Sequence, residues 1–300
     1  MALGIMKKAY GLGLVTVLFW STSAAAFKIT LGFFDVLQLL FYSIVTAVVV
    51  LGGFLGVTGK FSELFRLGKK EYFIYLVLGI LNPFIYYWMA VTAYDLLPAQ
   101  VAQPVNYTWV ITLTLLSVPL LKQSLGKEQI LATLVCYLGV VVISWRGNSG
   151  QAGSDISYLG LFLAVSCTII WALYWIYNIR MAQDPILGIF LNFFFSLPFA
   201  GLACWLFSSF TFEGIEGLLG AIWIGCFEFG FAFIAWITAL RLGNNTSRIT
   251  NLIFLTPFLS LVFIHYILGE KILVQTWIGL FLIIIGIGIQ KMSEAGHEQL

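Results

Sequence analysis

The sequence predicts an all-α membrane protein whose ten transmembrane helices form two inverted five-helix repeats. Three observations predict this fold: an apolar composition, a series of long apolar runs, and a weak similarity between the two halves of the chain. Of the 300 residues, 61% are hydrophobic and 9% are charged, and the mean hydropathy is +1.00. Soluble domains are about half apolar and about a quarter charged, so lipid is the expected solvent.

Each apolar run is long enough, as a helix, to cross a hydrocarbon layer of roughly 30 Å. The runs lie at about 11–27, 36–57, 72–92, 99–121, 128–145, 158–177, 186–207, 218–240, 246–268 and 273–290. A polar segment rich in Gly, Ser and Asn divides them into a first repeat at 1–146, a loop at 147–157, and a second repeat with a short tail at 158–300. The first run resembles a secretory signal, but its removal would leave nine spans, so we expect it to be retained.

Basic residues predict the orientation. With ten spans, twelve of the 15 Lys and Arg residues fall on the side of the amino terminus. Cytoplasmic loops carry the excess of basic residues, so we expect a multi-pass protein of the cell (inner or plasma) membrane with both termini in the cytoplasm. The net charge of +2 and the scatter of the basic residues among short loops exclude a nucleic-acid partner.

The two halves correspond at an offset of 146 to 147 residues. Gly79 falls on Gly225, Gln123 on Glu270, and Gly139 on Gly286. Because five is an odd number, the second copy enters the membrane from the opposite side, which gives inverted repeats. Such halves can exchange conformations and open one central site alternately to each side, so the pattern favours secondary transport of a small molecule.

Short motifs in both halves carry a family resemblance. They are Leu-Phe-Trp-Ser-Thr at 18–22, Val-Asn-Tyr-Thr-Trp at 105–109, Ile-Trp-Ala-Leu-Tyr at 170–174, Gly-Phe-Ala-Phe-Ile-Ala-Trp at 230–236 with Gly-Asn at 243–244, and Leu-Gly-Glu-Lys at 268–271. With these motifs the chain resembles the EamA family of the drug/metabolite transporter superfamily, and in particular the YddG-type exporters of aromatic and neutral amino acids. The resemblance implies ten helices around a cavity lined by spans 1, 3, 4, 6, 8 and 9, and export without ATP. The chain departs from the family pattern at Val110, where a Pro is expected, and at Gln123, where a Glu is usual.

Polar side chains at membrane depth are costly unless they face the protein interior or a wet cavity. In the fourth span, Gln100, Gln103 and Tyr107 share one helical face, with Asn106 beside it. They could bond neighbouring helices together or line a cavity, and their clustering favours the cavity. In the ninth span, Arg248 could snorkel to the headgroups or, with Asn251 on the same face, hold a substrate carboxylate.

Glu228 lies near the middle of the eighth span, where a carboxyl must be protonated or paired. It could bind a substrate ammonium, accept a coupling proton, or serve as a structural acid. Asn82, near the repeat-related position of the third span, is its expected counterpart in the cavity.

Aromatic residues cluster at similar depths. Those expected to stack on a flat substrate or on its amino group are Trp20, Tyr86, Trp171, Tyr174 and Trp236. We expect the neighbouring Tyr87, Trp88 and Trp175 to anchor helices at the interface or to pack against lipid.

These observations favour an exporter of amino acids or similar small amphipathic metabolites, acting as a monomer or weak homodimer, with protons as a possible coupling ion. A multidrug carrier or a nucleoside- or sugar-type carrier is the nearest alternative, followed by a non-transporting receptor or an intramembrane enzyme. The sequence lacks HExxH, GxSxG and GxxxxGK[ST] motifs, so no catalytic residues are expected. The four cysteines lie in apolar runs without metal-like spacing, so we expect no metal or other cofactor.

Overall fold

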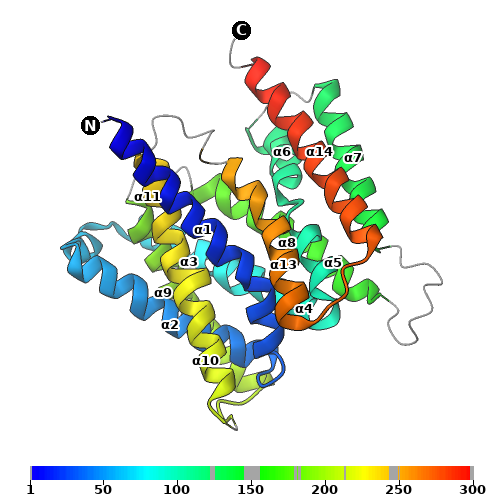
Figure 1. Cartoon of the computed structure of the whole chain (residues 1–300). Helices are drawn as coiled ribbons and strands as arrows, with labels where there is room; N and C mark the ends of the chain where they lie inside the picture. The colour runs from blue at the N-terminus through cyan, green and yellow to red at the C-terminus, as the bar shows by residue number, and fades with distance from the viewer. Residues whose placement is uncertain are drawn as a thin grey trace.

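The structure is a computed structural model that describes residues 2–121, 126–144, 156–178, 181, 184–212, 214–242, 249 and 251–297. Every regular element in these residues is a helix (Figure 1). The elements before residue 145 are α1 (Ala2–Thr30), α2 (Val36–Val57), η1 (Phe61–Arg66), α3 (Lys69–Gly79), η2 (Ile80–Ile85), α4 (Tyr86–Leu96), α5 (Ala99–Asn106), α6 (Trp109–Leu121) and α7 (Lys127–Ser144). Those after residue 157 are α8 (Tyr158–Asn178), α9 (Pro185–Phe207), α10 (Glu216–Trp223), η3 (Ile224–Phe231), α11 (Ala232–Leu242), η4 (Asn251–Leu255), α13 (Thr256–Leu268) and α14 (Val274–His297).

Six helical stretches of the described chain are long and apolar enough to cross a membrane: Gly4–Thr30, Val36–Val57, Lys69–Leu96, Tyr158–Asn178, Pro185–Phe207 and Glu216–Leu242. Three shorter apolar helices lie at Ile130–Ser144, Leu252–Leu268 and Val274–Ile289. Large apolar side chains point outward along these helices; Val49, Trp205 and Phe281 are each more than 60% exposed. An exposed apolar surface of this kind needs lipid around it, as expected for a multi-pass membrane protein.

The fourth predicted span is broken in two, whereas the sequence predicted one helix over 99–121. The break comes at Thr108, where the main-chain N–H and the side-chain hydroxyl both donate to the carbonyl of Val105, at 3.1 and 2.8 Å. These local bonds replace the regular hydrogen bond to residue 104, so α5 ends and α6 starts in a new direction.

Two π-helical turns, η2 and η3, interrupt the third and eighth predicted spans at positions that coincide under the offset of 146. In η2, Asn82 leaves the helical region at φ −146° and ψ 121°. Pro83 follows it and has no N–H to donate. The sequence predicted one continuous span over 72–92. Such turns are rare in proteins and are frequent at functional sites.

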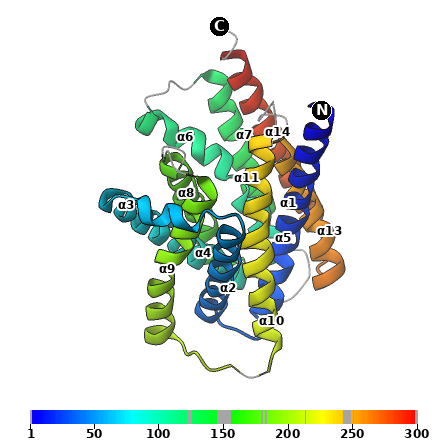
Figure 2. The ribbon, with the colours of Figure 1, turned by 90° about the vertical axis from the view of Figure 1, so that its left-hand side faces the viewer.

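Helices from the two halves of the chain pack in pairs: α7 against α14, α2 against α9, α1 against α11, and α4 against α8 (Figures 1 and 2). If the halves are exchanged, each of the first two pairs maps onto itself and the last two map onto each other. The start of α1 and the end of α14 lie at the same end of the molecule (Figures 1 and 2).

The pair α7 and α14 packs backbone against backbone. A Cβ on Gly139 would lie 2.6 Å from the carbonyl oxygen of Gly279, and one on Gly286 would lie 2.7 Å from that of Ala132. These two contacts are related by a shift of 147 residues. We call this contact the glycine seam.

Candidate functional site

A cavity of about 250 Å³ lies between the halves of the chain. Its walls come from α1, α4, α5 and α6 on one side and from α8, η3, α11 and η4 on the other. Most of the lining side chains are aromatic, and the remaining polar ones are Ser23, Gln103, Asn106 and Glu228. The cavity therefore combines a large flat apolar surface with a few polar groups, as small-molecule sites commonly do.

The sequence-predicted candidates separate into three groups. Those that line the cavity are Trp20, Tyr86, Gln103, Asn106, Tyr107, Trp171, Glu228 and Trp236. Those outside its lining are Asn82, Gln100 and Tyr174. Arg248 and the side chain of Asn251 lie outside the described residues.

Glu228 projects from η3 and is held by hydroxyl groups from the other half of the chain. Tyr87 of α4 donates to Oε1 over 3.2 Å, and Ser23 of α1 hydrogen-bonds to Oε2. The indole N–H of Trp20 donates to the main-chain oxygen of Glu228 over 3.3 Å. Among the described lining residues Glu228 is the only acid, and Lys, Arg and His are absent. The described groups that bond this carboxyl are therefore neutral donors.

The Ser23 hydroxyl suits either protonation state of Glu228. Its oxygen lies 3.4 Å from the carbonyl of Phe19 as well as against the carboxyl. A serine hydroxyl has one hydrogen, which can go to an ionised carboxylate. When the carboxyl is protonated, Ser23 can accept from it and donate to Phe19 instead. Rotation of one hydroxyl therefore accommodates both protonation states of the carboxyl.

The amides of the cavity wall are engaged with tyrosines. Tyr94 donates to Oε1 of Gln103. The amide of Asn106 and the hydroxyl of Tyr86 exchange hydrogen bonds of 3.2 and 3.3 Å. These pairs fasten α5 to α4 and turn the aromatic rings of α4 toward the cavity.

The aromatic wall is continuous. The ring of Trp171 lies 4.5 Å from Tyr86, 5.9 Å from Trp175 and 6.3 Å from Trp109, centroid to centroid. Two further lining rings, Trp20 and Trp236, lie 5.8 Å apart, centroid to centroid. Edge and tilted arrangements at these distances are the favoured geometries for aromatic pairs.

The expectation that Tyr87 and Trp175 face lipid or the interface is wrong. Tyr87 is 3% exposed and both residues line the cavity, because Tyr87 directly follows the cavity-lining Tyr86 and Trp175 lies about one helical turn after the cavity-lining Trp171. Ser23 and Tyr94 were missed as well. Helical spacing could have found them, since Ser23 follows Trp20 by three residues and Tyr94 follows Tyr87 by seven.

Asn82 and Tyr174 form a separate polar cluster with Asn192 of α9, so Asn82 is not the cavity counterpart of Glu228. The amide nitrogen of Asn192 donates to the Tyr174 hydroxyl over 3.0 Å, and Asn82 hydrogen-bonds to the same group. Asn82 is 1% exposed. Its non-helical backbone turns the amide toward α8 and α9, which a helical reading of the sequence cannot anticipate.

Gln100 fastens α5 to α14, so the cavity-wall expectation is wrong for this residue. Its Oε1 accepts from the N–H of Leu273 at 3.0 Å and from the hydroxyl of Thr276 at 2.9 Å, and its Nε2 donates to the carbonyl of Lys271 at 3.0 Å. The carboxylate of Glu270 accepts the N–H groups of Ala99 and Gln100 at the start of α5. An acid at a helix N-terminus stabilises it through otherwise unpaired N–H groups.

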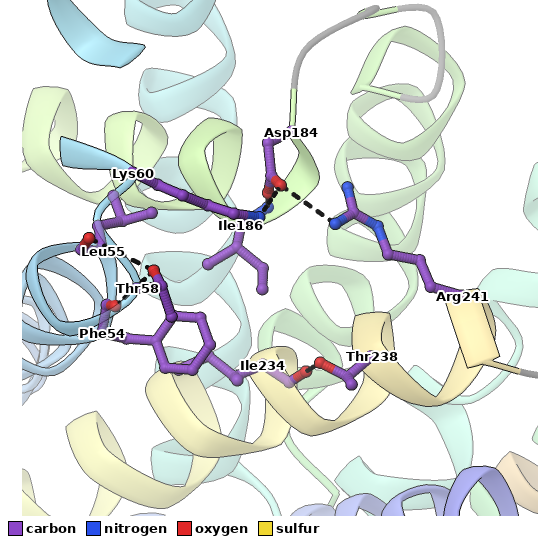
Figure 3. Close-up of polar contacts among 9 residues, drawn as sticks. All are labelled: Phe54, Leu55, Thr58, Lys60, Asp184, Ile186, Ile234, Thr238 and Arg241. Atoms are coloured by element: carbon purple, nitrogen blue, oxygen red, sulfur yellow. Dashed lines mark hydrogen bonds and ion pairs between the residues drawn. The ribbon is translucent and has the colours of Figure 1, made fainter. Parts of the chain in front are cut away.

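An ion cluster joins three helix ends (Figure 3). The carboxylate of Asp184, which caps α9, lies 2.5 Å from Nζ of Lys60 beyond α2 and 3.1 Å from the guanidinium of Arg241 in α11. Burial alone would raise the pKa of Asp184, but hydrogen bonds from Lys60, Arg241 and the N–H of Ile186 outweigh it and hold the pKa at about 2. The carboxylate is therefore charged at neutral pH.

The chain matches known membrane transporters along most of its length. The model of the EamA-like transporter family matches it at residues 7–145 and again at 158–290. The uncharacterized transporter YvbV of Bacillus subtilis is 26% identical, over 90% of this chain and 87% of that protein. An uncharacterized transporter of Clostridium kluyveri is 25% identical, over 98% of this chain and 96% of that protein. A solved crystal structure superposes with a TM-score of 0.67 at 23% identity, covering 95% of this chain and 97% of the other, which shows a shared fold. Since the family model accounts for both halves, the chain belongs to the EamA-like transporter family of the drug/metabolite transporter superfamily.

Proposed function

We propose that the chain is a secondary transporter that exports amino acids or similar small amphipathic metabolites, with the cavity as its substrate site. The observation that carries the proposal is Glu228, a partly buried carboxyl that lines the cavity and whose described hydrogen-bond partners are neutral donors. An ionised carboxyl in such a place is costly without a countercharge. A substrate ammonium or a proton would supply the positive charge that the described cavity wall lacks.

The proposed mechanism is alternating access by two inverted five-helix repeats. It is supported by the helix pairs that interchange when the halves are exchanged, and by the double match to the family model. The glycine seam and the repeat-related π-helical turns fit the same relationship. In such a carrier one site serves both sides of the membrane and no ATP is needed.

The cavity favours a small metabolite over the alternative cargoes. Its volume of about 250 Å³ lies below the roughly 300–1,000 Å³ of sites for drug-sized ligands. Phosphate-bearing substrates such as nucleotide sugars need Arg or Lys, and the described lining offers an acid instead. These two properties support an amine-bearing metabolite of the size of an amino acid.

We place both termini in the cytoplasm of the cell expressing the protein, with the chain in its cell membrane. The excess of Lys and Arg on the amino-terminal side supports this orientation. The ends of α1 and α14 at one end of the molecule are compatible with it.

The test is counterflow in liposomes with the purified protein and labelled neutral amino acids. Wild-type protein should exchange at least one of them, and Glu228→Gln should slow that exchange. Glu128→Gln is the matched control, because Glu128 lies exposed in the first turn of α7 away from the cavity. Absence of exchange for every amino acid tested, in protein that remains folded, would refute the proposal.

A further inference from the structure

We propose that the cavity recognises the amine of its substrate and does not require a carboxylate, so that small organic amines carrying a flat or branched apolar group are substrates in their own right. The inference rests on the proposed function, since it takes the cavity as the transport site. It narrows the substrate from amino acids in general to ammonium compounds, of which amino acids are one kind.

The carboxyl of Glu228 has room for an ammonium. An ionised carboxylate offers about four acceptor positions, and each oxygen of Glu228 receives one hydroxyl bond, from Tyr87 and from Ser23. An ammonium carries up to three N–H donors and the missing positive charge. Pairing with it would therefore complete both the hydrogen bonds and the charge balance of the acid.

Aromatic rings flank the same carboxyl. The indole of Trp20 is held beside Glu228 by its bond to the main-chain oxygen, and the phenol of Tyr87 bonds the carboxylate itself. Trp171 lies 6.5 Å from Tyr87, centroid to centroid. Cations are attracted to the faces of Trp and Tyr rings, most strongly where water is excluded. An ammonium at Glu228 would thus meet a carboxylate and electron-rich rings together.

A substrate carboxylate would find only neutral donors among the described lining groups, because these include no Lys, Arg or His. Asn106 is bonded to Tyr86 through both its amide oxygen and its amide nitrogen, whereas the bond of Gln103 to Tyr94 uses only its Oε1. A second carboxylate would also repel Glu228 at short range in a cavity of this size. The described lining therefore favours the ammonium and the apolar group, and it offers no positive charge to the acid group of an amino acid.

Matched sets of three probes test the proposal with the full-length protein. One set is 2-phenylethylamine, phenylalanine and 3-phenylpropionate; the other is isoamylamine, leucine and 4-methylpentanoate. Each set holds the apolar group constant while the amine and the acid are varied. Binding is measured by ligand-induced thermal shift, and transport by counterflow in liposomes.

In at least one set, the amine should bind and exchange as well as or better than the amino acid, and the acid should do neither. Binding of the amino acid without the amine would overturn the inference and leave the proposed function standing. Failure of both the amines and the amino acids, with folded protein, would overturn both. Binding of the acids alone would overturn both as well.

Two pairs of variants, each a cavity residue with a matched exposed control, guard against nonspecific effects of amines on a membrane protein. Glu228→Gln should weaken amine binding about tenfold or more, because a charge-assisted hydrogen bond is replaced by a neutral one. Glu128→Gln should leave it unchanged. If Glu228→Gln fails to fold, Tyr87→Phe provides a second variant, which keeps the ring and removes one donor to the carboxylate; it should alter amine affinity, while Tyr158→Phe, 86% exposed, should not. Equal amine binding by wild type and every cavity variant would contradict the inference.

Discussion

Tyr87 of α4 donates its phenolic hydrogen to Glu228 of η3, so the acid in the second half of the chain is held by a residue of the first half. A rearrangement that separates α4 from η3 must break this bond, and with it the environment that keeps the carboxyl in place. Because Ser23 and Trp20 of α1 also bond Glu228, several hydrogen bonds tie this acid to the relative position of the two halves.

Exchange by the wild type should slow as the pH falls from neutral into the acid range. Protonation of Glu228 removes the negative charge that would pair with a substrate ammonium. The other titratable groups of the described lining are the phenols of Tyr86, Tyr87, Tyr94 and Tyr107, which stay neutral in this range. Counterflow measured against pH should give a flatter profile for Glu228→Gln than for wild type or Glu128→Gln. Superimposable profiles for all three would remove Glu228 from the pH response.

Gln100→Leu should destabilise the protein without weakening substrate binding. The change leaves the N–H of Leu273, the hydroxyl of Thr276 and the carbonyl of Lys271 without their amide partner, and an unsatisfied buried polar group costs about 1–3 kcal/mol. Thermal unfolding in detergent should show a lower Tm, while the ligand-induced shift persists. Gln103→Leu, at a residue that lines the cavity, should reduce that ligand-induced shift. A reduced shift for Gln100→Leu together with an unchanged shift for Gln103→Leu would contradict the structure.

Asp184→Asn should remove an acid-sensitive part of the stability. A carboxyl whose pKa is held at about 2 when folded, against about 3.9 when unfolded, stabilises the protein fully above the unfolded value and loses that contribution as the pH falls toward 2. Partly exposed ion pairs contribute only about 0–1 kcal/mol each, so the expected change in Tm is modest. Asp35→Asn is the control, since Asp35 caps α2 in the same way and accepts from Ser208. An Asp184→Asn variant with the pH dependence of the wild type would show that the ion cluster contributes nothing.

Gly79→Ala and Gly225→Ala should each cost about 1–3 kcal/mol through overpacking. The new Cβ would lie 2.4 Å from the main-chain oxygen of Asn192 in the first variant and 2.5 Å from that of Ser43 in the second. Gly53→Ala in α2 is the control, because open space surrounds its Cβ position and alanine favours a helix. Thermal unfolding should give the control a Tm at or above that of the wild type, and both variants a lower Tm than the wild type.

A fluorescent protein fused after the last residue should fluoresce, and alkaline phosphatase fused at the same place should be inactive. Both termini are proposed to lie on that side, where the excess of basic residues is expected. Paired fusions to a fluorescent protein and to alkaline phosphatase measure the two locations. Strong phosphatase activity would reverse the proposed orientation.

The sequence could identify Trp20, Trp236 and Glu228 as lining candidates because their depth and their polar or aromatic character are readable from one chain. It could not separate Gln100 from Gln103, because both lie on one helical face. Their different roles come from the neighbours that each meets, which belong to different parts of the fold. Tyr87 was misplaced for a related reason: depth along a helix does not say which way a side chain faces. The ion cluster was out of reach, since Lys60 and Asp184 lie 124 residues apart.

The glycine seam has a consequence for how this scaffold diversifies. Neither α7 nor α14 contributes a described side chain to the cavity, yet their contact permits almost no enlargement at Gly139 or Gly286. On the proposed function, exchanging a few rings around Glu228 should change cargo preference without disturbing the contact between α7 and α14. Libraries built to change the substrate should randomise the aromatic residues around Glu228 and keep the glycine seam unchanged.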